Sequence, residues 1–366
     1  MRTRPPFRAD HVGSLLRPAA VSEARAKWHN GKMSAEDLTE IENDAIRDVV
    51  TKQEAVGLKG VTDGEFRRDY WHLDFMFGFN GVDPSEEAYK SRFQDEDFVA
   101  PAAEVTGKVS YPATGIMQAH FQFLKNATKE TAKFTIPSAA QFRHREGVHL
   151  RDPDAYPDID AFWDDIGTAY NQAVSQFAAA GCKYIQVDDV NSALLCDERI
   201  RAGFSKYGDP DQMLEQNIEV NNAALANRPA DMAATTHMCR GNFKSTYAAE
   251  GGYEAIAEKF LSMMDVDGFF MEYDDERSGD FQPLRFLPKD KYAVIGIMTS
   301  KSPELESADT LKRRIDEAAK YAPLDQICIS PQCGFASTAE GNKLTEDDQW
   351  RKLERLVEVA QDVWGD

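Results

Sequence analysis

The sequence contains no long apolar run, and this absence limits where the protein can reside. No uninterrupted hydrophobic segment approaches the roughly 20 residues that a membrane-spanning helix needs. The basic N-terminal residues 1–6 are not followed by the apolar segment of a secretory signal. We therefore expect a cytoplasmic protein with no membrane partner.

Basic residues are scarce relative to acidic ones. The 366 residues include 42 Lys and Arg against 62 Asp and Glu, a formal net charge of −20. Proteins that bind nucleic acids or anionic lipids use Lys and Arg to neutralise phosphate groups. The acidic excess therefore argues against nucleic acid as a partner and is otherwise a feature that favours solubility.

Cysteine is also scarce, with five residues in the chain. A large chain expected in the cytoplasm does not use so few cysteines as a disulfide framework. Cys182 and Cys328 fall at or within predicted strands, where we expect core packing, and Cys196 has no predicted role. Cys239 and Cys333 each follow a predicted strand, so metal binding is the question to ask of them.

A regular alternation of short apolar strands and helices runs through the sequence. Strands are predicted at residues 8–14, 60–65, 133–138, 183–189, 231–237, 268–272, 292–298 and 326–330. Helices are predicted at residues 34–55, 159–180, 210–226, 253–264, 310–322 and 346–364. This pattern favours an α/β fold of the (β/α)8 TIM-barrel type over a doubly wound sheet. No G-x-G-x-x-G motif follows the first strand, which argues against dinucleotide binding.

The region between the second and third strands is less regular. Residues 83–97 are polar and are predicted as a loop, whereas residues 99–111 alternate enough to predict a small inserted β-hairpin. No change in composition marks a linker anywhere along the chain. We therefore expect residues 1–366 to form a single catalytic domain.

Residues at the predicted C-terminal strand ends matter most, because chemistry in a barrel collects there. His237 and Cys239 are two residues apart at the end of the fifth strand, so their side chains lie on the same side. This pair alone is weak evidence, but Glu272 ends the sixth strand and Cys333 follows the eighth. One imidazole, two thiolates and an exchangeable fourth ligand are typical of a catalytic zinc site.

Other polar residues follow the remaining strands and are further candidates. They are Ser14, Asp63, Glu65, Ser138, Asp188, Asp189 and the segment 299–301. Asp188 and Asp189 either serve the site or cap a helix, and His11 either contacts a ligand or packs within its strand. The sequence leaves these alternatives open.

Six segments together carry a resemblance to a known family. They read His11-Val12-Gly13-Ser14, Asp63-Gly64-Glu65-Phe66-Arg67, Tyr184-Ile185-Gln186-Val187-Asp188-Asp189, His237-Met238-Cys239-Arg240-Gly241-Asn242, Glu272-Tyr273-Asp274-Asp275-Glu276-Arg277-Ser278-Gly279-Asp280 and Ser330-Pro331-Gln332-Cys333-Gly334. With them the chain resembles the catalytic domain of cobalamin-independent methionine synthase over essentially its whole length. It is more closely similar to stand-alone 5-methyltetrahydropteroyltriglutamate–homocysteine methyltransferase-like proteins.

The resemblance implies a zinc-dependent S-methyltransferase of methionine biosynthesis. The zinc ligands then fall on His237, Cys239, Glu272 and Cys333. The residues that would hold the amino-acid part of a homocysteine-like thiol are Ser14, Glu65 and Asp188, with His11 beside them. A thiol bound to zinc loses its proton, which makes it the nucleophile that accepts the methyl group and becomes a thioether, methionine. Asp188 is also a candidate catalytic residue.

The sequence departs from the resemblance where the methyl donor would bind. In methionine synthase a histidine follows the seventh strand and assists protonation of the folate leaving group. Here Lys301 stands at about that place, in the loop 298–303, and becomes a second candidate catalytic residue. The sequence also has no counterpart of the N-terminal half of the full-length synthase, which helps to hold the folate. Methyltetrahydrofolate stays one candidate, and the donor is left open.

Two alternative functions also remain open. One is a zinc-dependent alkyltransferase that joins another thiol to an epoxide, as in the coenzyme M epoxide transferases, which resemble this family too. The other is a metal-free decarboxylase, because uroporphyrinogen decarboxylase shares the barrel type. The expected partners are a small-molecule thiol and a methyl donor, and the sequence leaves open whether the protein is a homo-oligomer.

Overall fold

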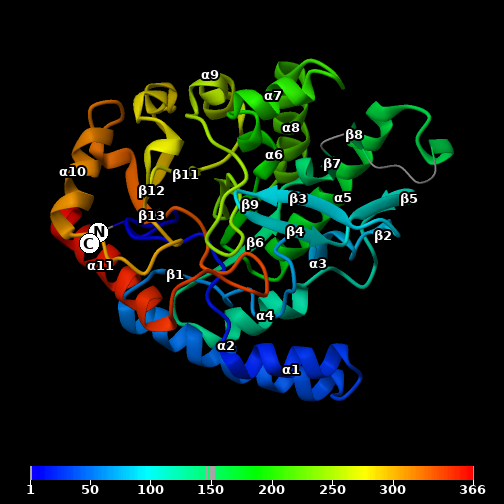
Figure 1. Cartoon of the computed structure of the whole chain (residues 1–366), viewed down its shortest axis with the longest axis horizontal. Coiled ribbons are helices and arrows are strands. Elements are labelled where there is room, and N and C mark those ends of the chain that lie inside the picture. Colours follow the sequence, from blue (N-terminus) through cyan, green and yellow to red (C-terminus); the bar gives the residue numbers. More distant parts are fainter. Residues whose placement is uncertain (1, 145–146, 149–152, 366) are drawn as a thin grey trace.

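Parallel strands curl around the centre of the protein, and helices surround them (Figure 1). The computed structural model describes residues 2–144, 147–148 and 153–365. Within these residues one sheet contains seven strands in chain order, and its strand order never reverses as it would in a doubly wound sheet. The strands are β1 (Gly60–Val61), β6 (Thr131–Pro137), β9 (Tyr184–Asp188), β10 (Ala233–Met238), β11 (Gly268–Glu272), β12 (Tyr292–Met298) and β13 (Ile327–Pro331). The predicted barrel is confirmed.

The eighth position of the barrel belongs to the N-terminal segment. Residues 8–14, predicted as a strand, form one isolated parallel bridge between Ala9 and Ile329 of β13. On the other side, the backbone N–H of Leu15 donates to the carbonyl of Gly64, just after β1, at 3.1 Å. The segment forms few strand-to-strand hydrogen bonds. The reason is that the side chain of Asp10 accepts hydrogen bonds from the backbone N–H groups of Phe7 and His11.

The helix predicted at residues 34–55 begins and ends at residues that favour its two ends, whereas the helix predicted at 310–322 covers residues 308–318. Ser34 caps the helix that starts at residue 35, and Gly57 ends it with φ 99°. The helices are α1 (Ala19–His29), α2 (Ala35–Val56), α3 (Leu73–Met76), α4 (Gln118–Ala127), α5 (Ile159–Ala179), α6 (Val190–Leu194), α7 (Glu198–Phe204), α8 (Pro210–Leu225), α9 (Glu254–Met263), α10 (Ala308–Ala318) and α11 (Glu346–Trp364). The core lies between sheet and helices, as where Phe177 of α5 packs on Phe134 of β6 at 4.9 Å.

The insertion between β1 and β6 is larger than the predicted hairpin. It contains β2 (Asn80–Pro84), β3 (Tyr89–Phe93), β4 (Glu96–Ala100) and β5 (Ala103–Ser110), in which β2 pairs with β5 and β3 with β4, both antiparallel. The prediction of a hairpin within 99–111 and a loop at 83–97 was therefore wrong in its boundaries. Residues 83–97 are polar because one face of β3 and β4 is exposed to solvent. A further short pair joins β7 (Arg143–His144) to β8 (Gly147–Val148).

A buried ion pair ties the N-terminal segment to the sheet. Lys133 of β6 is completely buried, and its Nζ lies 3.1 Å from Oδ1 of Asp10. The other oxygen of Asp10 accepts a hydrogen bond from the Tyr184 hydroxyl at 2.8 Å. The Lys133 ammonium also lies 4.0 Å from the centre of the Phe270 ring. These contacts close the barrel where the backbone ladder is short.

Replacing Lys133 by methionine should destabilise the protein by about 3–5 kcal/mol, because the Asp10 carboxylate would stay buried without its partner. Urea denaturation measures the change. The double variant Asp10→Asn, Lys133→Met removes both charges and should regain part of the loss. Exposed Lys289→Met is the matched control, which we expect to stay within about 0.5 kcal/mol. Equal denaturation midpoints for Lys133→Met and this control would contradict the structural role.

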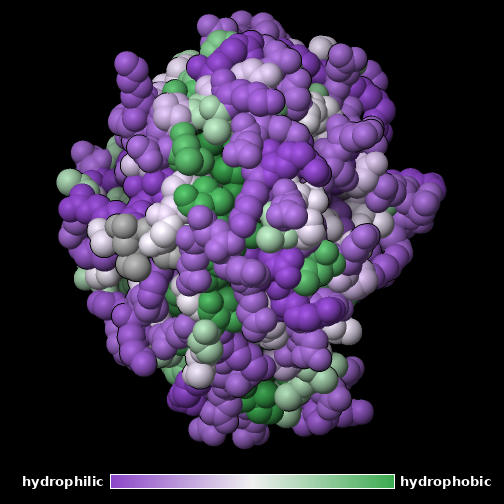
Figure 2. Space-filling view, turned by 90° about the vertical axis from the view of Figure 1, so that its left-hand side faces the viewer, coloured by the Kyte–Doolittle hydropathy of each residue, from purple (hydrophilic) through white to green (hydrophobic). Residues whose placement is uncertain are grey.

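The side of the molecule at the left of Figure 1 faces the viewer in Figure 2. Hydrophilic side chains cover most of this face, and hydrophobic ones lie in small groups between them. This pattern agrees with a composition in which 28% of residues are charged. Among the helices that the structure describes, none has the length and hydrophobicity to cross a bilayer.

Candidate metal centre

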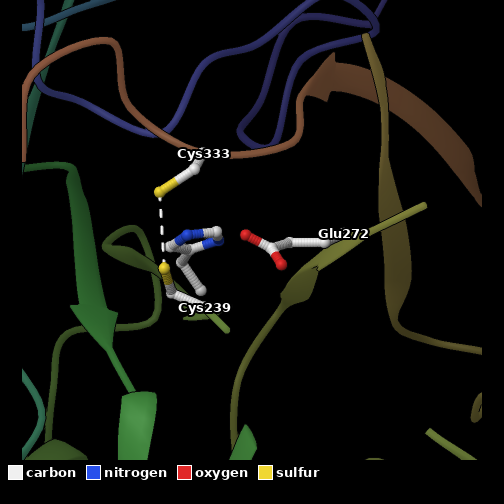
Figure 3. Close-up of side chains that lie close together, drawn as sticks. Cys239, Glu272 and Cys333 are labelled. Carbon is white, nitrogen blue, oxygen red and sulfur yellow. Dashed lines mark hydrogen bonds between the residues drawn. The ribbon is translucent and has the colours of Figure 1, made fainter. Parts of the chain in front are cut away.

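Four side chains from the ends of three strands of the same sheet converge at one point. His237 lies near the end of β10 and Cys239 directly after it, Glu272 ends β11, and Cys333 follows β13. One potential ligand atom of each residue lies within 4.8 Å of all the others, and all four residues are buried. Figure 3 shows Cys239, Glu272 and Cys333 directed toward one another. The parallel sheet brings them together because its strands end at the same rim.

The two cysteines of the cluster are in direct contact. Their Sγ atoms lie 3.4 Å apart (Figure 3). A hydrogen bond from the Cys239 thiol holds the pKa of Cys333 well below its usual range, and the same contact raises the pKa of Cys239. The backbone N–H of Gly241 lies 3.2 Å from the Cys239 sulfur and donates to it. The protein therefore stabilises a negatively charged sulfur at this point.

His237 and Glu272 complete the cluster with unused ligand atoms. Both ring nitrogens of His237 and Oε1 of Glu272 are buried and lack a hydrogen-bond partner among the described residues. Burial alone lowers the pKa of His237, but Cys333, Asp188 and Glu272 outweigh it and raise that pKa. A metal ion between the four residues would satisfy Oε1 of Glu272 and one of the two ring nitrogens of His237. The four donors therefore form a candidate site for a metal ion.

The other carboxylate oxygen of Glu272, Oε2, lies next to one backbone N–H and two guanidinium groups. Oε2 accepts a hydrogen bond from the backbone N–H of Arg240 at 3.3 Å and lies 3.4 Å from Nη2 of Arg277. The Arg240 guanidinium is 3.7 Å away and completely buried. Two guanidinium groups thus neutralise the carboxylate while Oε1 stays free for the cluster. Both arginines lie within the motifs that carry the family resemblance, but the sequence alone predicts no role for them.

A cavity of about 170 Å³ opens beside the cluster. Its wall includes His237, Cys239 and Cys333 of the candidate metal centre. Three residues that the sequence predicted as substrate-binding, Ser14, Glu65 and Asp188, line the same cavity. The structure therefore brings these predicted residues together around one space.

Glu65 and Asp188 are buried carboxyl groups with capacity to bind a further partner. Burial raises the pKa of Glu65 and raises that of Asp188 to about 7. Oε1 of Glu65 accepts a hydrogen bond from Thr135 at 2.6 Å, while Oε2 has no partner among the described residues. Glu65 also has a left-handed backbone, φ 61°, which few side chains adopt. Such strain is common at functional sites.

Ser14 reaches the cavity because a glycine makes room for it. A Cβ on Gly334 would lie 1.9 Å from the Ser14 hydroxyl oxygen, far inside van der Waals contact. The backbone N–H of Phe335 donates to the Ser14 carbonyl at 2.9 Å, which holds the two loops together. The residue after Cys333 must therefore be glycine if Ser14 is to stay in this position.

Three other predicted residues lie away from the cavity wall. His11 is buried, with Nε2 3.2 Å from the Gly60 carbonyl, and burial lowers its pKa to about 4. Lys301 has a buried Nζ without a hydrogen-bond partner in the described residues, and its charge acts on both cluster sulfurs. Asp189 accepts hydrogen bonds from Ser192 at the start of α6, as a cap. Of the adjacent acids, Asp188 alone lines the cavity.

Sequence reasoning missed the aromatic side of the cavity. Tyr89, Phe93 and Phe98 come from β3 and β4, and Trp71 and Phe243 come from loops after β1 and β10. The spacing of aromatics within residues 89–98 was the available signal. It was lost because this segment was predicted as a loop.

The fold and the cluster together define an α/β-barrel protein with a candidate metal centre at its strand ends. The sequence matches the family described as "Cobalamin-independent synthase, Catalytic domain" over residues 7–362. The chain belongs to this family, and membership supports a methyltransferase.

Relatives and solved structures agree with this assignment. The chain is 47% identical over 365 residues to the uncharacterized protein YxjH of Bacillus subtilis (strain 168), covering 98% of this chain and 95% of YxjH. It is similar to the putative vitamin-B12 independent methionine synthase from Listeria monocytogenes, with a TM-score of 0.80, 35% identity and 100% of both chains covered. A B12-independent methionine synthase from Shewanella sp. W3-18-1 shares the fold, with a TM-score of 0.74 at 21% identity and 97% of both chains covered.

Proposed function

We propose that this protein is a zinc-dependent S-methyltransferase that methylates the sulfur of a homocysteine-like thiol. The observation that carries the proposal is the cluster of His237, Cys239, Glu272 and Cys333, whose ligand atoms lie within 4.8 Å of one another beside a cavity. We further propose that the chain acts as one catalytic domain and works in the cytoplasm.

The cluster fits zinc by the chemistry of its donors. Two sulfurs, one imidazole and one carboxylate are the ligand types that catalytic zinc sites combine. Among the described residues, such an ion would satisfy the unpartnered Oε1 of Glu272 and one of the two unpartnered ring nitrogens of His237. Zinc, when bound here, lowers the pKa of a coordinating thiol and so supplies a nucleophilic sulfur at neutral pH. Glu272 is the ligand that we expect a substrate thiol to replace.

The acidic wall of the cavity suits the amino group of the thiol substrate. Glu65 and Asp188 are buried, and the unpartnered Oε2 of Glu65 offers an acceptor to an ammonium group. Charge-assisted hydrogen bonds of this kind are stronger than neutral ones. Ser14 contributes a hydroxyl that can donate to a carboxylate. These three residues would orient the substrate so that its sulfur reaches the cluster.

Lys301 and His11 are the remaining candidates, and neither lines the cavity. Lys301 brings a positive charge near the cluster sulfurs, so it would help to hold a thiolate there. His11 lies outside the cavity wall, and a substrate role for it stays a prediction. The proposed catalytic residues are therefore Asp188 and Lys301.

Replacing Arg277 should weaken zinc binding, because Arg277 helps to position the proposed metal ligand Glu272. Arg277→Gln leaves Glu272 with a weaker hold on Oε2, and we expect zinc affinity to fall by about 10- to 100-fold, as when an outer-shell partner is lost. Competition against a chromogenic chelator measures the affinity. Arg285→Gln is the matched control, because Arg285 is exposed and pairs with Glu254. Equal affinities for the two variants would contradict a role for Arg277 in positioning Glu272.

The proposed function is tested with metal analysis and a donor screen. Protein purified without chelators is analysed for zinc, and homocysteine is then incubated with the enzyme and a series of methyl donors. Mass spectrometry should detect methionine with at least one of them. Absence of stoichiometric zinc would overturn the metal-dependent mechanism and favour a metal-free reaction. Alkylation of thiols only by epoxides would reassign the reaction while keeping the metal.

A further inference from the structure

Arg143 lines the cavity beside the candidate metal centre, and the proposed function gives it no role. It belongs to β7, which follows β6 in the chain. Only 9% of the residue is exposed. Among the described residues of the cavity wall, Arg143 is the one Lys or Arg side chain. It is therefore the permanent positive charge that a molecule in this cavity meets.

The hydrogen-bond partners of the Arg143 guanidinium are neutral. Its Nε donates to Oδ1 of Asn217 at 2.8 Å, and Nη2 donates to Oε1 of Gln216. The guanidinium carbon lies 4.8 Å from the ring centre of Trp163. Nη1 has no hydrogen-bond partner among the described residues. These contacts hold the guanidinium in place, but none of them supplies a negative charge.

The other buried arginines among the described residues differ from Arg143 in this respect. Arg25, Arg68 and Arg240 each form an ion pair with a buried glutamate. Arg143 forms no such pair within the described part of the chain. Burial lowers the pKa of Arg143 to about 10, and no neighbouring charge offsets that effect. The group still stays protonated at neutral pH, so a buried charge is left without a counter-ion.

The two acids of the cavity wall have other partners. Oε1 of Glu65 lies 3.7 Å from Nη1 of Arg68. Oδ1 of Asp188 accepts a hydrogen bond from Gln186 at 2.8 Å. Neither acid contributes to the pKa of Arg143. A bound anion would supply the charge that the described residues do not.

Asn191 holds the backbone of Arg143 in position. Its Nδ2 donates to the Arg143 carbonyl at 3.0 Å and to the Ala140 carbonyl at 2.8 Å. Asn191 belongs to α6, which follows β9, and it lines the same cavity as Asp188. The position of Arg143 is thus coupled to the strand end that carries a proposed thiol-binding residue.

We propose that Arg143 binds an oxyanion group, a carboxylate or a phosphate, of the second substrate. The inference rests on the proposed function, because it assumes that the thiol uses Glu65 and Asp188 and leaves Arg143 to the other molecule. A buried charge without a partner is strongly destabilising, and pairing with an anion offsets that cost. A hydrogen bond from a guanidinium to an oxyanion is also about twice as strong as a neutral one. Arg143 therefore selects an acidic second substrate over a neutral one.

Benzoate and benzamide test the charge preference, because they have nearly the same shape and only benzoate is an anion. Each is titrated into zinc-loaded protein and followed by ligand-observed NMR. The titrations are run with and without saturating homocysteine, which keeps benzoate away from the metal. Phenyl phosphate in the same series distinguishes a phosphate from a carboxylate site. We expect benzoate or phenyl phosphate to bind at least about tenfold more tightly than benzamide.

Variants assign the preference to Arg143. Arg143→Gln should weaken binding of the preferred anion by about 10- to 100-fold, the size of a charged hydrogen bond, and leave benzamide binding unchanged. A merely structural role would weaken both probes alike. Arg143→Lys keeps a positive charge and should retain part of the preference. Arg47→Gln is the matched control, because Arg47 is exposed and pairs with Asp44, and it should change neither probe.

The same variant has a kinetic signature. With the methyl donor that the screen identifies, Arg143→Gln should raise the KM for that donor by about 10- to 100-fold and leave kcat nearly unchanged. Homocysteine binding should also stay unchanged, because the thiol does not use Arg143. Circular dichroism checks that each variant is folded.

The outcomes distinguish this inference from the proposed function. Equal affinities for benzoate, phenyl phosphate and benzamide, or an unchanged preference in folded Arg143→Gln, would overturn the anion site. An efficient methyl donor without any acid group would overturn it too and leave the proposed function standing. If homocysteine neither binds nor reacts with any donor, the proposed function fails. The titrations without homocysteine then still decide whether Arg143 binds an anion.

Discussion

Changing Cys239 or Cys333 to serine is expected to weaken zinc binding by at least about 100-fold and to abolish methyl transfer, because loss of a direct ligand exceeds loss of an outer-shell partner. A serine hydroxyl is a poor substitute for a thiolate, since it stays protonated at neutral pH. The barrel should stay folded, because both residues follow their strands and lie outside the main hydrophobic core.

The measurement combines zinc content after dialysis, activity with homocysteine and thermal unfolding. Cys182→Ser is the matched control, because that buried thiol donates to the Tyr184 carbonyl at 3.4 Å and a serine can keep the bond. The control should retain zinc and activity. Full thiol alkylation by either Cys239→Ser or Cys333→Ser would show that the ligand assignment is wrong.

The second large effect is expected at Asp188. Changing it to asparagine removes a buried carboxylate from the cavity, and homocysteine binding should weaken by about 10- to 100-fold, the size of a charged hydrogen bond. Zinc should be retained, because Asp188 is not one of the four cluster residues. Calorimetric titration of the zinc-loaded variant with homocysteine measures the change.

The neighbouring acid provides a sharp comparison. Asp189 accepts hydrogen bonds from the Ser192 backbone and from the Asn221 side chain, both at 2.9 Å, so its oxygens are already used within the fold. Asp189→Asn should lower the free energy of unfolding by about 1–3 kcal/mol and leave homocysteine binding unchanged. If Asp188→Asn bound homocysteine as tightly as the unchanged protein, the thiol substrate would not be an amino acid.

Much of the candidate site could be predicted because it depends on strand ends. The predicted strands 268–272 and 292–298 have the same bounds as β11 and β12. Glu272 was therefore correctly predicted to lie at the end of a strand. Glu272 and Cys333 could then be joined to His237 and Cys239 without knowing any loop. The roles of all these residues in catalysis stay predictions.

The insertion could not be predicted in the same way. Residues 89–98 read as polar because their outer face meets solvent, and the aromatic residues of the inner face gain meaning only against Phe243. The roles of the two arginines that contact Glu272 also depend on the tertiary structure, so the sequence did not predict them. Arg240 and Arg277 are 37 positions apart in sequence (277 minus 240), yet both reach one carboxylate oxygen.

The sequence by itself determined the strand–helix alternation, the caps of the helices and the residue types at the strand ends. These features are local, because hydrophobic periodicity and capping act within a few residues. Only the tertiary structure decided that Cys239 and Cys333, 94 residues apart, lie 3.4 Å from each other. It also decided that Asp188 faces the cavity while Asp189 caps α6, and that β3 and β4 complete the cavity with aromatic rings. Such contacts depend on how loops and an inserted sheet pack across the barrel, which local sequence preferences do not specify.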